Sequence, residues 1–343
     1  MNLAKASKPR MFLMRLLDWS LLSLVLLSHC ASAGLISFAT VNAPPGHRSE
    51  VFGINDSGVM VGVTYQPPPL GGSGYASGTG FIYDGAMFAS LPVSIAGSTS
   101  IFPFGLNNVG DYVGQYVLGI THGFLHSVSA TTSVDPTLTG ASASQALGIN
   151  DSGDIVGRYV TSVDGNNHGY LYSGGVFFPI DVPGAEVTQS FGINNRGDIV
   201  GDYRNPTGNF HGFTLINGVF TTIDLPGARR TSIFGVNDFG DIVGYAEPQT
   251  GTGYAFVISG GELTTFSANS ALAPQTEAYD INNNGDIVGS YTSGDTVLGF
   301  IARVDLASHR IPEPSSLHLL CGGIAGLLLS ASASARGERG RIA

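Results

Sequence analysis

Short clusters of Asn and Asp recur along this chain, and their oxygens are of the kind that calcium binds, six to eight at a time. Asn150, Asp151 and Asp154 form one such cluster. The spacing departs from the alternate-residue order of an Asp-x-Asp-x-Asp-Gly calcium loop, and the first cluster has Val59 in place of its last Asp. Tight hairpin turns with Gly in the left-handed conformation use the same residues. We therefore predict turns and no cofactor, with calcium as the alternative.

Three histidines stand in equivalent places, each followed by Gly and an aromatic residue: His122, His168 and His211. If their strands lined a central axis, the three imidazoles would converge and could hold zinc or another metal. Other copies of this phrase have Thr, Tyr or Leu instead, so the ring would be half-formed. We therefore assign no metal ligands and expect strand-end histidines that bond to a neighbouring structural unit.

Catalytic arrangements have little support in the sequence. No Gly-x-Ser-x-Gly motif stands between a strand and a helix, because the body has no amphipathic helix. The pairs Asp151/Asp154 and Asp238/Asp241 could act as glycosidase carboxylates. Both pairs recur as part of the turn, whereas a catalytic pair would be expected once. We therefore assign no catalytic residue and expect that the protein is not an enzyme.

The Asn and Asp clusters belong to a repeat. The phrase Phe-Gly-Ile-Asn-Asp, or a close variant, occurs six times, with its first Asn at 55, 107, 150, 194, 237 and 282. Successive copies lie 43 to 45 residues apart, except that a Pro- and Gly-rich insertion at 66–80 lengthens the first interval to 52. A loop that breaks a repeat is a frequent place for binding, although a solvated insertion is the simpler explanation.

The pattern of each copy predicts about four short strands in roughly 43 residues, which matches one blade of a β-propeller. Gly218, for example, marks a turn between two strands rich in β-favouring residues. The repeats begin inside a unit, at Phe38, and end on the strand of Phe300, which would open another unit. We therefore predict an all-β fold, a closed six-bladed β-propeller of four-stranded repeats. An open β-solenoid is the alternative.

Residues 1–33 have the organisation of a secretory signal peptide. Basic residues precede the apolar run 21–27, which is too short to span a bilayer. Ala31 and Ala33 are small residues at the two positions that a signal peptidase reads, so we predict cleavage between Ala33 and Gly34. An uncleaved anchor is the alternative.

Residues 312–343 form a second targeting segment. The 19 residues 317–335 carry no charge, and Arg336, Arg339 and Arg341 follow them. This pattern predicts a C-terminal transmembrane helix with a basic cytoplasmic flank. Several Gly and Ser residues weaken the span, which suits a transient sorting device better than a permanent anchor.

The body between these segments, residues 34–311, carries 22 Asp and Glu, 8 Arg and no Lys, a formal net charge of −14. Nucleic-acid binding needs a basic face, so nucleic acid is excluded as a partner. Both cysteines, Cys30 and Cys321, lie outside the body. The body therefore has no disulfide, no thiolate nucleophile and no cysteine metal site.

The body resembles the bacterial extracellular repeats called HAF-type. The resemblance rests on His-Gly-Phe phrases such as 211–213 and on the run Gly-Ile-Asn-Asn-x-Gly-Asp-Ile-Val-Gly at 192–201. That family has no established biochemical role. The tail resembles a PEP-CTERM sorting signal, in which Pro312, Glu313 and Pro314 precede an apolar stretch and a basic cluster. This resemblance implies processing by an exosortase in a Gram-negative bacterium that makes exopolysaccharide.

We therefore expect an exported, non-catalytic surface or extracellular-matrix protein that binds glycan or a protein partner through loops at one face. Its precursor would be anchored in the membrane by the tail until an exosortase processes it. The mature body would lie at the cell surface or outside the cell. A secreted polysaccharide hydrolase or lyase on a propeller scaffold is the alternative.

Overall fold

The computed structural model describes residues 35–41, 47–66, 78–128, 130–268, 275–294 and 296–306. The predicted cleavage residues Ala31, Ala33 and Gly34 lie outside this part of the chain. Also outside it are Pro312, Glu313, Pro314, the span 317–335, Arg336, Arg339, Arg341 and most of the insertion 66–80. Within the described residues, no helix has the length and apolar character needed to cross a membrane.

Strands make up the regular structure of the described residues, as the β-branched and aromatic runs predict. In chain order they are β1 (Leu35–Val41), β2 (Arg48–Ile54), β3 (Met60–Tyr65), β4 (Gly78–Tyr83), β5 (Phe88–Ser90), β6 (Ile101–Leu106), β7 (Tyr112–Leu118), β8 (Ile120–Ser127), β9 (Ala130–Ser133), β10 (Ala141–Ile149), β11 (Ile155–Thr161), β12 (Asn167–Ser173), β13 (Val176–Ile180), β14 (Val187–Ile193), β15 (Ile199–Arg204), β16 (Phe210–Ile216), β17 (Val219–Ile223), β18 (Ala228–Val236), β19 (Ile242–Pro248), β20 (Tyr254–Ser259), β21 (Glu262–Phe266), β22 (Thr276–Ile281), β23 (Asp286–Ser293) and β24 (Thr296–Val304).

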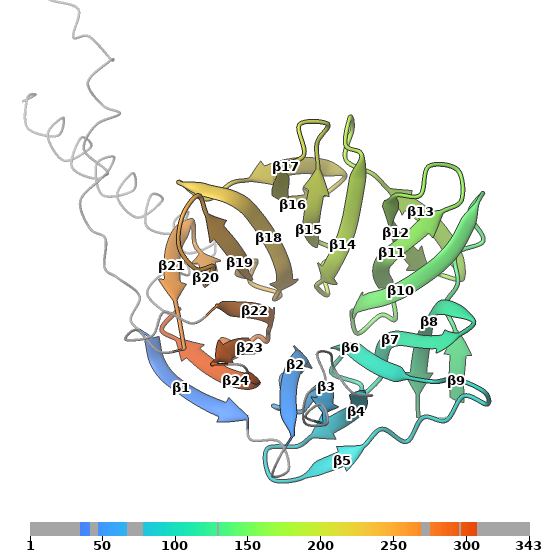
Figure 1. Ribbon diagram of the computed structural model, residues 1–343, viewed down its shortest axis with the longest axis horizontal. Helices are drawn as coiled ribbons and strands as arrows, with labels where there is room; N and C mark the ends of the chain where they lie inside the picture. The colour runs from blue at the N-terminus through green and yellow to red at the C-terminus, as the bar shows by residue number, and fades with distance from the viewer. Residues whose placement is uncertain are drawn as a thin grey trace, which may run out of the picture. The chain divides into compact units, whose positions relative to one another are not determined.

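The strands form antiparallel sheets around a central axis, in a β-propeller arrangement (Figure 1). Strands β2 to β5, β6 to β9 and β10 to β13 each form a four-stranded sheet in sequence order. The strands nearest the axis are β2, β6, β10, β14, β18 and β22. The core lies between successive sheets, since one cluster joins Val113 of β7 to Ala146 of β10 and Tyr170 of β12.

The two ends of the strand series meet in one sheet. Strand β1 pairs with β24, beside β23 and β22, and places Phe38 opposite Ala302. Phe38 also stacks on Phe300 with ring centroids 4.8 Å apart. The prediction that the first and last strands close the ring is therefore confirmed, and the open solenoid is wrong.

The prediction of six four-stranded blades is wrong. Four sheets have four strands, but β14 to β21 form a single eight-stranded sheet. Its two halves meet at one parallel pair, Phe210 with Arg230. The Arg230 guanidinium lies 4.8 Å from the centre of the Phe210 ring and 3.3 Å from the buried carboxylate of Asp202. Because an unpaired buried carboxylate is costly, this pairing holds the halves together. The predicted transmembrane helix over 317–335 lies outside the described residues, so it stays a prediction.

A glycine of the second strand and an aromatic ring of the third strand interlock in each unit. A Cβ at Gly201 would lie 2.0 Å from the carbonyl oxygen of Gln189 and 2.7 Å from the Phe213 ring, which is fully buried. The ring fills the space that the missing side chain leaves. The other pairs are Gly62 with Phe81, Gly114 with Phe124, Gly157 with Tyr170, Gly244 with Phe256 and Gly289 with Phe300. This contact explains why the Ile-Val-Gly and His-Gly-Phe phrases recur together.

Candidate functional site

A β-bulge in each axial strand turns one large side chain toward the axis. In β10 the register shifts between Ala146 and Gly148, which leaves Leu147 as the extra residue, and a bulge re-aims the side chain it carries. The equivalent residues are Phe52, Phe104, Phe191, Phe234 and Tyr279. Neighbouring rings in the order Phe104, Phe52, Tyr279, Phe234, Phe191 lie 5.0 to 5.5 Å apart. These six side chains, the aromatic layer, line two cavities on the axis.

On one side of the aromatic layer, six buried asparagines join the loops in a closed circle. They are Asn55, Asn107, Asn150, Asn194, Asn237 and Asn282. Each Nδ2 donates to the backbone carbonyl of the next at 3.0 to 3.3 Å, and the last returns to the first. Within its own loop, Asn194 Oδ1 accepts the N–H groups of Arg196 and Asp198. Gly197 adopts φ 81° between them, so the predicted turns are confirmed.

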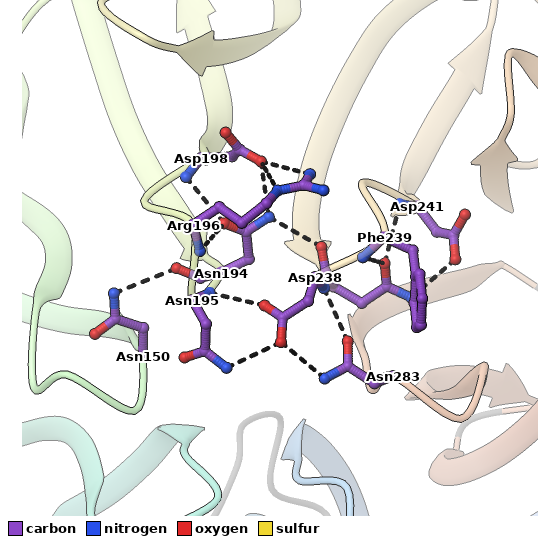
Figure 2. Close-up of polar contacts among 10 residues, drawn as sticks. Asn150, Asn194, Asn195, Arg196, Asp198, Asp238, Phe239, Asp241 and Asn283 are labelled. Atoms are coloured by element: carbon purple, nitrogen blue, oxygen red, sulfur yellow. Dashed lines mark hydrogen bonds and ion pairs between the residues drawn. The ribbon is translucent and has the colours of Figure 1, made fainter. Parts of the chain in front are cut away.

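The residue after each of these asparagines joins a second ring, in which Asp and Asn alternate. Its members, the Asp/Asn ring, are Asp56, Asn108, Asp151, Asn195, Asp238 and Asn283. Each Asn donates both Nδ2 hydrogens, one to the carboxylate on either side, at 2.9 to 3.1 Å. Figure 2 shows Asp238 between Asn195 and Asn283. Each carboxylate also accepts one backbone N–H.

Hydrogen bonds within the Asp/Asn ring stabilise the ionised form of its carboxylates. Burial raises the pKa of Asp238, but the Asn195 backbone N–H, the two flanking amides and the Arg196 cation outweigh it, so this pKa lies below its ordinary value. About 630 Å³ of empty space, partly open to solvent, lies between this ring and the aromatic layer. Because the amide hydrogens of the ring are all used within it, we assign the ring to closure of the fold rather than to ligand capture.

Asp280 breaks the symmetry of that first cavity. The other five copies have Gly here, and a Cβ on any of these would lie 2.6 to 2.8 Å from backbone of the next axial strand. Asp280 Oδ2 instead accepts the Ile54 N–H at 3.0 Å, across the seam between β22 and β2. Burial raises the pKa of Asp280 to about 7; the Ile54 and Ile281 N–H groups oppose the rise and Asp56 adds to it. The side chain is half-buried and lines the cavity.

On the other side of the aromatic layer, the polar side chains differ from unit to unit. Gln145 precedes Leu147 along β10, whereas the buried asparagine of this unit follows it, so the two cavities lie at opposite ends of the axis. Arg158 of β11 donates from Nε to Gln145 and from Nη1 to Gln189. Gln189 in turn donates to buried Asp202 at 2.9 Å. Neutral amides therefore hold the Arg158 guanidinium in place.

Arg158 and Gln145 form the polar wall of the second cavity, and the aromatic layer forms its floor. The cavity holds about 590 Å³ of empty space, including the part open to solvent. Burial lowers the pKa of the Arg158 guanidinium, although the charge of Asp202 opposes this. The rings of this floor are tilted or edge to face with one another, at 43° to 74°. An apolar ligand face can therefore pack on their exposed edges and faces while the guanidinium and amides bind polar groups. This cavity is the candidate binding site.

Two carboxyl groups occupy the position of Gln145 in the first and last units. Glu50 accepts a hydrogen bond from the Tyr65 hydroxyl at 2.9 Å, and Glu277 accepts one from the Tyr279 hydroxyl at 3.2 Å. Burial raises the pKa of Glu50, the Tyr65 hydroxyl lowers it and the charge of Glu277 raises it, so the net shift is upward. This end of the axis thus carries carboxyls on one side and a guanidinium on another.

The three predicted histidines lie on the third strands of their units, so they do not converge on the axis. Nδ1 of His122, His168 and His211 bonds to an Asp 13 residues later, at 2.9 to 3.0 Å. The His122 ring also stacks on Tyr116, with centroids 5.0 Å apart. These contacts stay within one unit rather than reaching a neighbouring one as predicted. The described residues place no three His, Cys, Asp or Glu side chains together as metal ligands.

The carboxylates weighed as glycosidase pairs belong to the turns. Asp151 and Asp238 are members of the Asp/Asn ring. Asp154 and Asp241 each accept the amide of the buried Asn in their own loop, at 3.3 and 2.9 Å. A repeated structural contact thus accounts for all four carboxylates.

Sequence reasoning missed three features of the axis, and each had a signal in the aligned repeats. Asn-Asp alternates with Asn-Asn from copy to copy, which marks the Asp/Asn ring. Asp280 stands once where five copies have Gly. Arg158 stands where the equivalent residues are Val63, Gln115, Asp202, Tyr245 and Ser290. Positions that vary among otherwise similar repeats therefore mark the second cavity.

No protein-family model and no curated protein sequence matches this chain. Similar solved structures include the fucose-specific lectin from Aleuria aurantia, 14% identical over 78% of this chain and 99% of the lectin, with a TM-score of 0.47. TolB from Acinetobacter baumannii is 13% identical over 76% of this chain and 64% of its own, at 0.45. YCF48 from Cyanidioschyzon merolae is 11% identical over 78% and 98%, at 0.42. Similarities this low carry no ligand or activity over to this chain.

Proposed function

We propose that this chain is an exported, non-catalytic glycan-binding protein of the cell surface or extracellular matrix, and that it binds glycan in the cavity beside Arg158. The contrast between the two ends of the axis carries the proposal. The Asp/Asn ring is symmetric and uses its own donors, whereas the Arg158 end differs from unit to unit. Sugar rings offer apolar faces to an aromatic floor and hydroxyl groups to amides and guanidinium.

A glycan panel tests this proposal on the full-length chain. Leu147→Trp fills the floor of the cavity and is expected to weaken glycan binding more than 10-fold. Leu263→Trp adds the same bulk on the outer strand β21, where Leu263 is 41% exposed, and is expected to leave binding unchanged. Thermal unfolding confirms that both variants fold. If Leu147→Trp leaves glycan binding unchanged, glycan does not bind in this cavity.

Export rests on the two terminal segments. The signal peptide would direct the chain across the inner membrane, and an exosortase would process the tail near Pro314. The intact mass of material exported by the native host tests this. We expect a mass that lacks residues 1–33 and 317–343, and a retained full-length precursor for Glu313→Ala. An exported mass that includes residues 317–343 would contradict processing.

A second candidate, a polysaccharide hydrolase or lyase, is favoured by one observation. Glu50 is a carboxyl with a raised pKa near a second carboxylate, Glu277, and such pairs serve general acid and base catalysis. The same glycan panel, assayed for new reducing or unsaturated ends, separates the two functions. Chain cleavage that Glu50→Gln abolishes would establish the enzyme and overturn the non-catalytic proposal.

A further inference from the structure

Arg158 is a half-buried cation without a carboxylate partner among the described residues. Five other arginines there form ion pairs with Asp or Glu: Arg196, Arg204, Arg229, Arg230 and Arg303. Arg158 instead donates from Nε and Nη1 to two glutamines, and its Nη2 has no partner in the described part of the chain. Asp202, the carboxylate whose charge acts on Arg158, is already ion-paired with Arg230. The cost of burying the Arg158 cation is therefore compensated only in part. A ligand anion in the second cavity would compensate the remainder.

The cavity beside Arg158 continues outward along β10. Gln145 and Arg158 line both the axial cavity and a neighbouring one of about 430 Å³. Ala143 and Ser144 line that neighbour and a third one of about 340 Å³, which reaches His122. These volumes include the parts open to solvent. Because neighbouring cavities share lining residues, we treat the three as one candidate groove, the β10 groove, which runs from β8 to the axis.

The β10 groove has the side chains that a sugar polymer requires. Thr121, Gln145 and Asn167 line its middle section, and hydroxyls and amides both donate and accept hydrogen bonds, as sugar hydroxyls do. Ala143 leaves the groove open because its side chain is small. At the axial end, the planar guanidinium of Arg158 matches a carboxylate better than a hydroxyl.

We propose that the ligand is an acidic polysaccharide, a chain of uronic-acid sugars that lies along the β10 groove with one carboxylate on Arg158. This inference rests on the proposed glycan-binding function and names its substrate class. The net charge of −14 over residues 34–311 opposes a polyanion at long range. That repulsion is screened beyond about 8 Å at 0.15 M salt, whereas contact with Arg158 persists. Affinity is therefore expected to hold or rise as salt is increased from 10 to 150 mM.

Calorimetric titration of the full-length chain with α-1,4-galacturonate oligomers of one to six units tests the inference. The same oligomers after reduction of their carboxyl groups are the matched neutral ligands. We expect the acidic hexamer to bind, and Arg158→Gln to weaken it about 10- to 100-fold, as for loss of a charge-assisted hydrogen bond. Arg303→Gln, which removes an equal charge from the ion pair with Asp286, is expected to change nothing.

A second pair of variants tests the groove. Ala143→Trp blocks its middle without touching the axial cavity, so it is expected to weaken the hexamer at least 10-fold and the monomer not at all. Val219→Trp, on the exposed face of β17, is the control for added bulk. An equal effect of Ala143→Trp on monomer and hexamer would overturn the assignment of the groove.

The outcomes separate this inference from the function on which it rests. If neutral and acidic oligomers bind equally and Arg158→Gln has no effect, acid recognition is wrong while glycan binding stands. If no glycan of either kind binds, but an acidic peptide does, the proposed function itself is wrong. Weakening of the acidic hexamer by added salt would indicate nonspecific ion attraction and would also overturn the assignment to Arg158.

Discussion

An amide and a carboxylate have nearly the same shape, yet the amide donates two hydrogen bonds and the carboxylate only accepts them. The Asp/Asn ring depends on this difference at every position. Six Asp side chains would place like charges together without donors, and six Asn side chains would leave amide hydrogens facing one another. Alternation gives each Asp side chain two amide donors and one backbone donor, which explains a pattern in the repeats that their turn geometry does not require.

We expect Asn195→Asp to destabilise the fold by about 1–2 kcal/mol, because it removes two donors and sets three carboxylates side by side. Ser152→Asp adds the same charge in the neighbouring loop but outside the ring, and is expected to cost less than about 0.5 kcal/mol. Denaturant unfolding at pH 7 measures both. Exchange of Asp for Asn and Asn for Asp at all six positions should restore most of the loss; a sixfold variant as unstable as Asn195→Asp would contradict the alternation argument.

At the scale of strands, the repeated phrases describe contacts between strands rather than separate features. The bulge in the first strand turns a large side chain, such as Phe191, to the axis, and the glycine of the second strand receives the ring of the third. Each phrase therefore supplies one half of a contact whose other half lies in another phrase. This arrangement limits substitution at Gly201 although its backbone conformation is ordinary for any residue.

We expect Gly201→Ala to destabilise the protein by about 3 kcal/mol or more, since its Cβ would meet the Gln189 carbonyl at 2.0 Å and the Phe213 ring at 2.7 Å. Gly208→Ala is the matched control. Gly208 has φ 88°, and a Cβ added to it would have no atom within 4 Å, so only backbone strain of about 1 kcal/mol is expected. Denaturant midpoints compare the two. Equal losses would mean that the interlock contributes nothing beyond backbone conformation.

The strands, the turns and the pairing of β1 with β24 could be predicted, because they depend on local sequence patterns that recur in each repeat. The blade count could not, because Arg230 reaches Asp202, 28 residues earlier in the chain, and joins two predicted blades. The same limit applies to the candidate site. Arg158 is held by Gln189, 31 residues away, and such a neighbour follows from the packing of units rather than from periodicity.

For the whole molecule, the seam between the first and last repeats is the distinctive place. Strand β1 completes the last sheet, and Asp280 bonds to Ile54 where the other copies have two backbones in close approach. Asp280, at the seam, is therefore the titratable residue at a position where the other five repeats have Gly. The stability of the closed ring is coupled through it to pH.

The pKa of Asp280 is raised to about 7, above the value of about 4 expected in the unfolded chain. The stability that protonated Asp280 contributes is therefore present below pH 4 and lost as pH rises to 7. The Asn amide offers only one oxygen to the Ile54 and Ile281 N–H groups, so we expect Asp280→Asn to be less stable than the wild type near pH 4.5. Relative to the wild type, it is expected to gain about 2–4 kcal/mol between pH 4.5 and pH 8. Denaturant unfolding at both pH values measures the difference. Parallel pH profiles for the two proteins would show that Asp280 titrates normally.

The alternation of Asp and Asn also has a consequence for parity. Two residue types can alternate around a closed ring only if the ring has an even number of members. Deletion or duplication of one repeat would place two Asp or two Asn side chains next to each other in the Asp/Asn ring. Deletion or duplication of two adjacent repeats would preserve the alternation. The unit that can be gained or lost without breaking the ring is thus a pair of repeats, roughly twice the length of the sequence period. Relatives with the same ring are expected to differ by even numbers of repeats.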